Sequence, residues 1–204
     1  STQGYSSAAS DVYKRQASGD LIVVGYAQVG AESDWRTANT ESFKSTFTEE
    51  NGYKLIFDDA QQKQENQIKA IRSFIQQDVD YIVVAPVVET GWEAVLQEAQ
   101  EAGIPVILSD RQMDVDESLY ECWVGGNFIK EGETAGNWLA DYLKAQGRDG
   151  EDINIVTLQG TIGASAQVGR TEGFGNILKQ HDNWKMLDMQ TGEFTQAKGQ
   201  EVME

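Results

Sequence analysis

Short apolar runs alternate with amphipathic segments along almost the whole chain. Apolar runs typical of strands stand at residues 21–26, 53–59, 81–85 and 105–109, and the segments between them carry apolar side chains at helical spacing. These runs are apolar on successive positions, as expected for strands buried on both faces. The pattern therefore predicts a parallel sheet covered by helical crossovers, which is a doubly wound α/β fold.

The alternation continues in the second half of the chain. Strands are predicted at residues 122–126, 153–160 and 185–190, helices at about 127–145 and 165–180, and a further helix from Thr195. We divide the chain into a first α/β lobe at residues 20–125 and the start of a second α/β lobe at 126–204. The last predicted helix has only its first apolar residues, so we expect the second lobe to be incomplete.

Residues 1–19 differ from the rest of the chain. They are small and polar and show no apolar period. We interpret them as a disordered tail, a remnant of a processed leader or a cloning artefact, and we leave them out of the predicted fold.

Composition and charge exclude several kinds of partner. The chain has 204 residues, 40% of them hydrophobic, which is enough for a substantial core. It carries 33 acidic and 16 basic residues, a formal charge of −17, and no basic cluster, so nucleic acid is not an expected partner. No run approaches the length of about 18 apolar residues that a membrane span needs. No signal peptide stands in this sequence, and we expect any export signal to have been removed.

The residue types that build metal sites and covalent catalysis are scarce. Cys122 is the only cysteine of the sequence, and we interpret it as a small buried side chain. His181 is the only histidine, and we interpret it as an exposed turn residue. Residues 159–165 are glycine-rich but lack the Gly-Lys-Ser/Thr ending of a phosphate loop. Asp114 and Asp116 lack the spacing of a calcium loop. We therefore predict no metal, no cofactor and no catalytic residue.

Two charged dipeptides follow apolar runs. Trp35-Arg36 stands shortly after the first predicted strand, and Asp110-Arg111 directly after the fourth. Ligands of doubly wound sheets bind outside the carboxyl ends of the strands. A sugar offers C–H faces that stack on an aromatic ring and hydroxyls that bond to Arg and Asp, so the pattern predicts a sugar site. The alternatives are a core role for Trp35 and a local ion pair for Asp110-Arg111.

Longer stretches of sequence resemble a known family. The stretches are residues 58–111, QVGAESDWR before them, and LQGTIGASAQVGRTEGF and TGEFTQAKGQEVME after them. They resemble the periplasmic sugar-binding proteins of ABC transporters, and within that group the galactofuranose-binding proteins, relatives of the ribose-binding protein. The resemblance covers about residues 20–204. It implies a type I binding protein whose two lobes, joined by three crossings, close on a monosaccharide and present it to a membrane permease.

The resemblance also implies roles for individual residues. Trp35 would stack on the sugar and Arg36 would donate to a hydroxyl, with Glu32 or Ser33 adding a contact. In the second dipeptide, Asp110 would accept two sugar hydroxyls, while Arg111 would donate to the ring oxygen or to a neighbouring hydroxyl. Arg170 would reach the ligand from the second lobe, its alternative being a role on a helix surface. Because guanidinium groups stay protonated, we expect little change of affinity between about pH 6 and 8.

The chain departs from the family in length. Family members continue beyond the point that corresponds to Glu204, and their later part holds further ligand residues and the return to the first lobe. The expected location is periplasmic or extracellular, with a lipid anchor if the source is Gram-positive.

Two other classes of protein share this architecture. A LacI-like regulator would need a basic helix-turn-helix, for which residues 1–19 are too short and too polar. The ligand domain of an extracellular sensor stays open as an alternative. An enzyme on a flavodoxin-like fold would need a base, a nucleophile or a metal, and the residues singled out above supply none of these.

Overall fold

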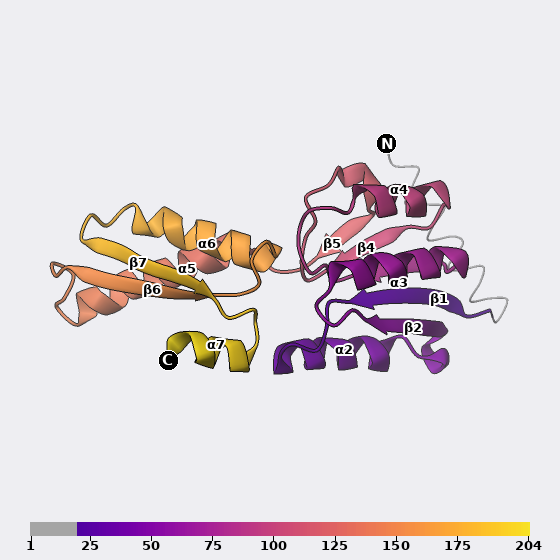
Figure 1. Cartoon of the computed structure of the whole chain (residues 1–204), viewed down its shortest axis with the longest axis horizontal. Helices are drawn as coiled ribbons and strands as arrows, with labels where there is room; N and C mark the ends of the chain where they lie inside the picture. Colours follow the sequence, from indigo (N-terminus) through magenta and orange to yellow (C-terminus); the bar gives the residue numbers. More distant parts are fainter. Residues whose placement is uncertain (1–19) are drawn as a thin grey trace. The chain divides into compact units, whose positions relative to one another are not determined.

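The structure is a computed structural model that describes residues 20–204 (Figure 1). The interpretation of residues 1–19 lies outside the described residues. The chain divides into two compact units. The first reaches Pro86 and also holds Gly91–Ser109 and Val115–Trp123. The second holds Val124–Glu204 and two loops, Val87–Thr90 and Asp110–Asp114.

The first unit is built on a parallel sheet. Within the described residues it has five strands in the order β2-β1-β3-β4-β5. The strands are β1 (Ile22–Gln28), β2 (Tyr53–Asp59), β3 (Tyr81–Val84), β4 (Val106–Ser109) and β5 (Cys122–Val124). The pairs β1-β2, β1-β3 and β3-β4 are parallel. Because β2 and β3 lie on opposite sides of β1, the sheet is doubly wound, and the predicted fold class is confirmed.

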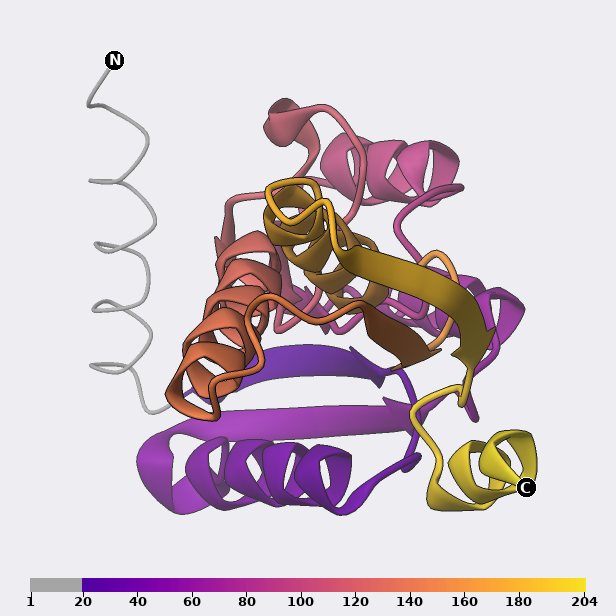
Figure 2. The same ribbon diagram turned by 90° about the vertical axis from the view of Figure 1, so that its left-hand side faces the viewer.

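Helices cover both faces of this sheet. They are α2 (Asp34–Thr46), α3 (Gln64–Gln76) and α4 (Glu93–Glu101), with the short turns η1 (Glu49–Asn51) and η2 (Glu117–Leu119). Helix α2 lies alongside β2 in both views (Figure 1, Figure 2). Alternate residues of β1 face different helices: Tyr26 stacks on Phe43 of α2, and a Cβ at Gly25 would lie 2.5 Å from Phe74 of α3. Both faces of β1 are therefore buried, as its apolar run predicts.

The second unit repeats the alternation with fewer strands. Its elements are α5 (Phe128–Ala145), β6 (Ile153–Gln159), α6 (Ser165–Leu178), β7 (Trp184–Thr191) and α7 (Gln196–Met203). Among the described residues, β6 and β7 form a two-stranded parallel sheet with an irregular register between Ile155 and Val156. Helices α5 and α6 pack on the same face of this sheet (Figure 1). The buried core between them is made by Leu143, Ile153, Ile177 and Trp184.

Glycines allow α5 and α6 to approach closely. A Cβ at Gly132 would overlap the carbonyl oxygen of Arg170, and a Cβ at Gly173 would overlap that of Ile129. Gly132-x-x-x-Gly136 on α5 faces Gly169-x-x-x-Gly173 on α6. The two backbones are therefore in direct contact, which any larger residue at these positions would prevent.

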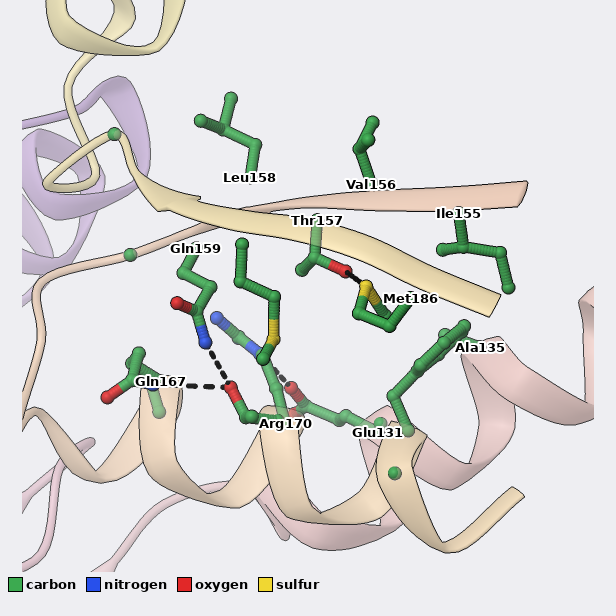
Figure 3. A pocket seen from close by; sticks show the side chains of 18 of the residues that line it. Glu131, Ala135, Ile155, Val156, Thr157, Leu158, Gln159, Gln167, Arg170 and Met186 are labelled. Atoms are coloured by element: carbon green, nitrogen blue, oxygen red, sulfur yellow. Dashed lines mark hydrogen bonds and ion pairs between the residues drawn. The ribbon is translucent and has the colours of Figure 1, made fainter. Parts of the chain in front are cut away.

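The opposite face of the β6–β7 sheet is apolar and exposed. Val156 and Leu158 point away from α5 and α6 (Figure 3). Their exposed fractions are 59% and 46%, and that of Leu187 on β7 is 60%. We call these three side chains the outer apolar face. Strands with such residues are normally covered on both faces in parallel sheets.

Two single residues differ from the sequence-based interpretation. Cys122 is exposed, so the prediction of a buried side chain is wrong. It lies on β5, the last strand in the order of its sheet, where fewer neighbours cover a side chain. His181 is half-buried and stacks on Trp184 at 4.2 Å between ring centroids, so it is not the exposed turn residue that was expected.

In the described part of the chain, no helix is long and apolar enough to cross a membrane.

Candidate functional site

The loop after β1 carries the first group of predicted site residues to the start of α2. Ser33 is the N-cap of this helix, and its Oγ accepts the backbone N–H of Arg36 at 3.2 Å. This bond satisfies one of the free donors at the helix N-terminus. Ser33 therefore has a structural role. It fixes the start of α2 and, with it, the positions of Trp35 and Arg36 in the first turn.

Trp35 and Arg36 are neighbours with opposite exposure. The Trp35 side chain is 58% exposed, which excludes the alternative of a core tryptophan. Arg36 is 2% exposed, and its guanidinium carbon lies 4.8 Å from the centroid of the Trp35 ring. A cation over one side of an aromatic ring is attracted by the ring and holds it in place. The pair is thus an accessible aromatic ring supported by a buried guanidinium.

Glu32 compensates the charge of Arg36. Its Oε1 accepts from Arg36 Nε at 2.9 Å, and both side chains are only 2% exposed. A positive charge is unfavourable at a helix N-terminus, and this ion pair explains why it is tolerated. Because a buried charge that loses its partner is costly, Glu32 and Arg36 have to be considered together.

A buried hydrogen-bond network joins this pair to β1. The side-chain oxygen of Asn39 accepts from Tyr26 Oη at 3.0 Å, from Gln28 Nε2 at 2.9 Å and from Arg36 Nη1 at 3.3 Å. Gln28 Nε2 also donates to Thr40 Oγ1 at 3.0 Å. The sequence-based prediction missed Gln28 and Asn39. A polar residue at the end of an otherwise apolar strand, as Gln28 is, was the available signal.

Gln67 of α3 connects the carboxyl ends of β1 and β3. It is fully buried, and its Nε2 donates to the carbonyl oxygens of Ala85 at 2.7 Å and Ala27 at 3.2 Å. These carbonyls lie at the carboxyl ends of the two strands, which is the ligand-binding end of a doubly wound sheet. Gln67 was also missed, although it belongs to the stretch that resembles the sugar-binding family.

The second charged dipeptide belongs to the second unit. Asp110 has a left-handed backbone with φ of 64°, and its N–H donates to the carbonyl oxygen of Val124 at 2.7 Å. Arg111 is 3% exposed and donates from Nη1 to the carbonyl oxygen of Val87 at 3.1 Å. Aspartate tolerates the left-handed region better than most residues. Asp110 therefore suits the turn that directly follows β4.

Phe194 is an aromatic contact of Arg111 that the sequence-based prediction missed. The Arg111 guanidinium carbon lies 4.9 Å from the Phe194 ring centroid. A Cβ at Gly160 would overlap that ring, so Phe194 is held against the backbone of Gly160. Phe194 follows the carboxyl end of β7, just as Trp35 follows that of β1. An aromatic residue shortly after a strand was the signal that could have identified Phe194. Using this signal required knowing that β7 ends at Thr191.

Arg170 lies on α6 and is bound to α5. Its Nε donates to Glu131 Oε2 at 2.9 Å, and its guanidinium carbon lies 5.1 Å from the Phe128 ring centroid. Both members of the ion pair are about half exposed, at 47% and 46%. The guanidinium is therefore partly free to contact solvent or a ligand, in contrast to that of Arg36.

A cavity of about 930 Å³ lies beside Arg170 and is lined by residues of β6, β7, α5 and α6 and by Gly199 of α7 (Figure 3). Its walls are mostly apolar and include Ile155, Phe174, Leu178 and Met186. One end is polar, where Thr171 Oγ1 accepts from Gln159 Nε2 at 2.8 Å and from Gln167 Nε2 at 3.2 Å. An apolar wall suits a hydrocarbon better than a hydroxyl-rich ligand, so the cavity as a whole is not a sugar site.

Two pairs of neighbouring carboxyl groups lie near the ends of strands. Burial and the adjacent Asp114 raise the pKa of Glu89, and burial and the adjacent Asp59 raise the pKa of Asp58. Each shift disfavours the ionised form in the folded chain. Among the described residues, no group of three or more His, Cys, Asp and Glu side chains could hold a metal ion.

The structure thus places the predicted residues in two groups. Glu32, Ser33, Trp35 and Arg36 form one continuous cluster in the first unit. Asp110, Arg111 and Arg170 lie in the second unit, where Phe194 joins Arg111.

The fold and these clusters define a class of protein that sequence comparison identifies. Residues 24–204 match the family model of the periplasmic binding protein domain, and the chain belongs to this family. The resemblance noted in the sequence is confirmed.

Individual relatives are named for sugars. The chain is 50% identical over 184 residues to the galactofuranose-binding protein YtfQ of Escherichia coli (strain K12), which covers 90% of this chain and 56% of that protein. A Mycobacterium smegmatis structure in complex with β-D-fucofuranose is 51% identical with a TM-score of 0.84, covering 90% of this chain and 59% of that one.

A third relative is the arabinose-transporter component of Shewanella sp. ANA-3, bound to α- and β-L-arabinofuranose. It is 50% identical with a TM-score of 0.81, over 89% of this chain and 58% of that one. The chain therefore spans a little over half the length of these relatives.

Proposed function

We propose that this chain is part of an extracytoplasmic solute-binding protein that binds a monosaccharide in its furanose form and delivers it to an ABC permease. Three relatives of about 50% identity are named for galactofuranose, fucofuranose and arabinofuranose. The observation that carries the proposal is the exposed Trp35 ring supported by the buried Arg36 at the carboxyl end of β1.

The first unit supplies a stacking surface and a fixed donor. The exposed side of the Trp35 ring would contact the C–H face of the sugar, which is its apolar side. Arg36 would donate to a sugar hydroxyl, while Glu32 neutralises it and Ser33 caps the helix. Because the ion pair and the cap already fix this geometry, little order has to be gained when the sugar binds.

The second unit carries further groups that can bind sugar hydroxyls. Asp110 would accept from hydroxyls, and Arg111 would donate while its other side rests on Phe194. Arg170 has the partly exposed guanidinium that a further hydroxyl contact requires. These groups bind without making or breaking a covalent bond, so we propose a transport function and no enzymatic one. A periplasmic or extracellular location follows from that function.

Isothermal titration calorimetry of the 204-residue chain tests the proposal. L-Arabinose, D-galactose and D-fucose are titrated into the wild-type chain, Trp35→Ala and Trp138→Ala. Trp138 is the matched control, because it is 63% exposed against 58% for Trp35. We expect heat with at least one sugar, its loss in Trp35→Ala, and its retention in Trp138→Ala. Absence of heat with every sugar, or equal heat in both variants, would contradict the proposal.

A further inference from the structure

The side-chain oxygen of Asn39 is a meeting point for three donors. Tyr26 Oη, Gln28 Nε2 and Arg36 Nη1 all lie within 3.3 Å of it. An amide oxygen has two lone pairs, so its acceptor capacity is fully used. Only a side chain with such an oxygen at this position could join these three groups.

Chemistry fixes the orientation of the Asn39 amide. Arg36 has no acceptor, so the group that faces it has to be an oxygen. Gln28 gives the same answer independently: its Oε1 accepts from the backbone N–H of Val29 at 3.0 Å, which leaves its Nε2 to face Asn39. The oxygen of Asn39, and not its NH₂ group, therefore points into the network.

The Asn39 contact defines the plane of the Arg36 guanidinium. Glu32 contacts Nε and Asn39 contacts Nη1, so the planar group is held from two directions. The same guanidinium lies over Trp35. Gln28 is completely buried and connects Asn39 to the end of β1. The position of the guanidinium is thus tied to the sheet and not only to its own helix.

We propose that Asn39 is a positioning residue of the sugar site, which acts through Arg36. The expected effect of Asn39 on sugar affinity rests on the proposed function. Its effect on the orientation of Arg36 is independent of any sugar. Loss of the Asn39 oxygen removes one restraint on rotation about the Nε–Cζ bond of Arg36 and weakens sugar binding. A carboxylate oxygen at the same position replaces it.

Three variants separate positioning from general structure. Asn39→Leu removes the acceptor at similar size, and Asn39→Asp keeps it. Thr40→Val is the matched control, because it removes the other acceptor of Gln28 but no contact of Arg36. Circular dichroism checks that each variant is folded, and Asn39→Ala replaces Asn39→Leu if the latter does not fold.

The first measurement needs no sugar. In ¹⁵N NMR spectra, the two Nη groups of Arg36, assigned by their loss in Arg36→Lys, should give separate resonances in the wild type, Asn39→Asp and Thr40→Val. They should merge in Asn39→Leu because rotation is faster. Separate resonances in Asn39→Leu would overturn the inference.

The second measurement is the dissociation constant of the sugar that gives heat with the wild type. We expect about a tenfold increase in Asn39→Leu, as for loss of one hydrogen bond to a charged group, and little change in Asn39→Asp and Thr40→Val. Unchanged affinity in Asn39→Leu would overturn the inference. If the wild type binds no sugar, the proposed function fails, and the Nη resonances alone decide whether Asn39 positions Arg36.

Discussion

An Arg–Glu pair in the first unit and another in the second have the same bond length but opposite surroundings. Arg36–Glu32 in the first unit and Arg170–Glu131 in the second both have Nε–Oε distances of 2.9 Å. The first pair is 2% exposed on both sides, and the second is about half exposed. Distance alone therefore does not tell which pair matters, because the energetic effect of an ion pair depends on its access to water.

The two units also differ in how far their sheets are covered. The first unit has helices on both faces of a five-stranded sheet, and its polar groups Gln28, Arg36 and Gln67 are buried in hydrogen-bond networks. The second unit, within the described residues, has a two-stranded sheet whose outer apolar face is exposed.

Removing one member of each ion pair is expected to give the largest difference between the units in the free energy of unfolding. Glu32→Gln removes the carboxylate charge that faces the buried Arg36 guanidinium, and we expect a loss of about 3–5 kcal/mol in the free energy of unfolding. The matched variant Glu131→Gln acts on the half-exposed pair, and we expect a change of about 0–1 kcal/mol. Urea unfolding followed by circular dichroism measures both. Equal losses in the two variants would mean that burial does not distinguish the pairs.

Substitutions in the helix packing of the second unit are expected to change the free energy of unfolding less than Glu32→Gln does. Gly173→Ala places a Cβ against the carbonyl oxygen of Ile129, and we expect a loss of about 1–3 kcal/mol as α5 and α6 are forced apart. Gly175→Ala on the same helix meets no atom within 4 Å, and we expect a gain of about 0.5–1 kcal/mol from helix propensity. Thermal unfolding of the two variants should therefore shift in opposite directions. A stabilised Gly173→Ala would contradict the close contact of the helices.

The predicted fold follows closely from local pattern. The predicted strand at 53–59 is β2, and that at 105–109 differs from β4 by one residue. Strand periodicity and glycine at helix ends are local signals, and they are sufficient for a sheet whose neighbours are set by short crossovers. The prediction was wrong for Cys122, because the exposure of a residue on β5 depends on which strand ends the sheet.

The candidate site was predicted only in part. Trp35 and Arg36 were found from their place after a strand, but the burial of Arg36 depends on Glu32 and Asn39 packing around it. Phe194 was missed because its approach to Arg111 depends on two successive left-handed residues, with φ of 53° and 58°, at Glu193 and Phe194. A sequence shows which residues follow a strand, but not which of their side chains turn inward.

The contact between Trp35 and a sugar tests the central claim most directly. The Trp35 indole resonances, assigned by their loss in Trp35→Ala, are irradiated in the presence of the sugar that binds, and nuclear Overhauser effects to the ring C–H protons are recorded. The account predicts transfer from Trp35 to the C–H protons of one sugar face and none from Trp138. Transfer from Trp138 alone, or no transfer from Trp35 to a sugar that binds, would contradict it.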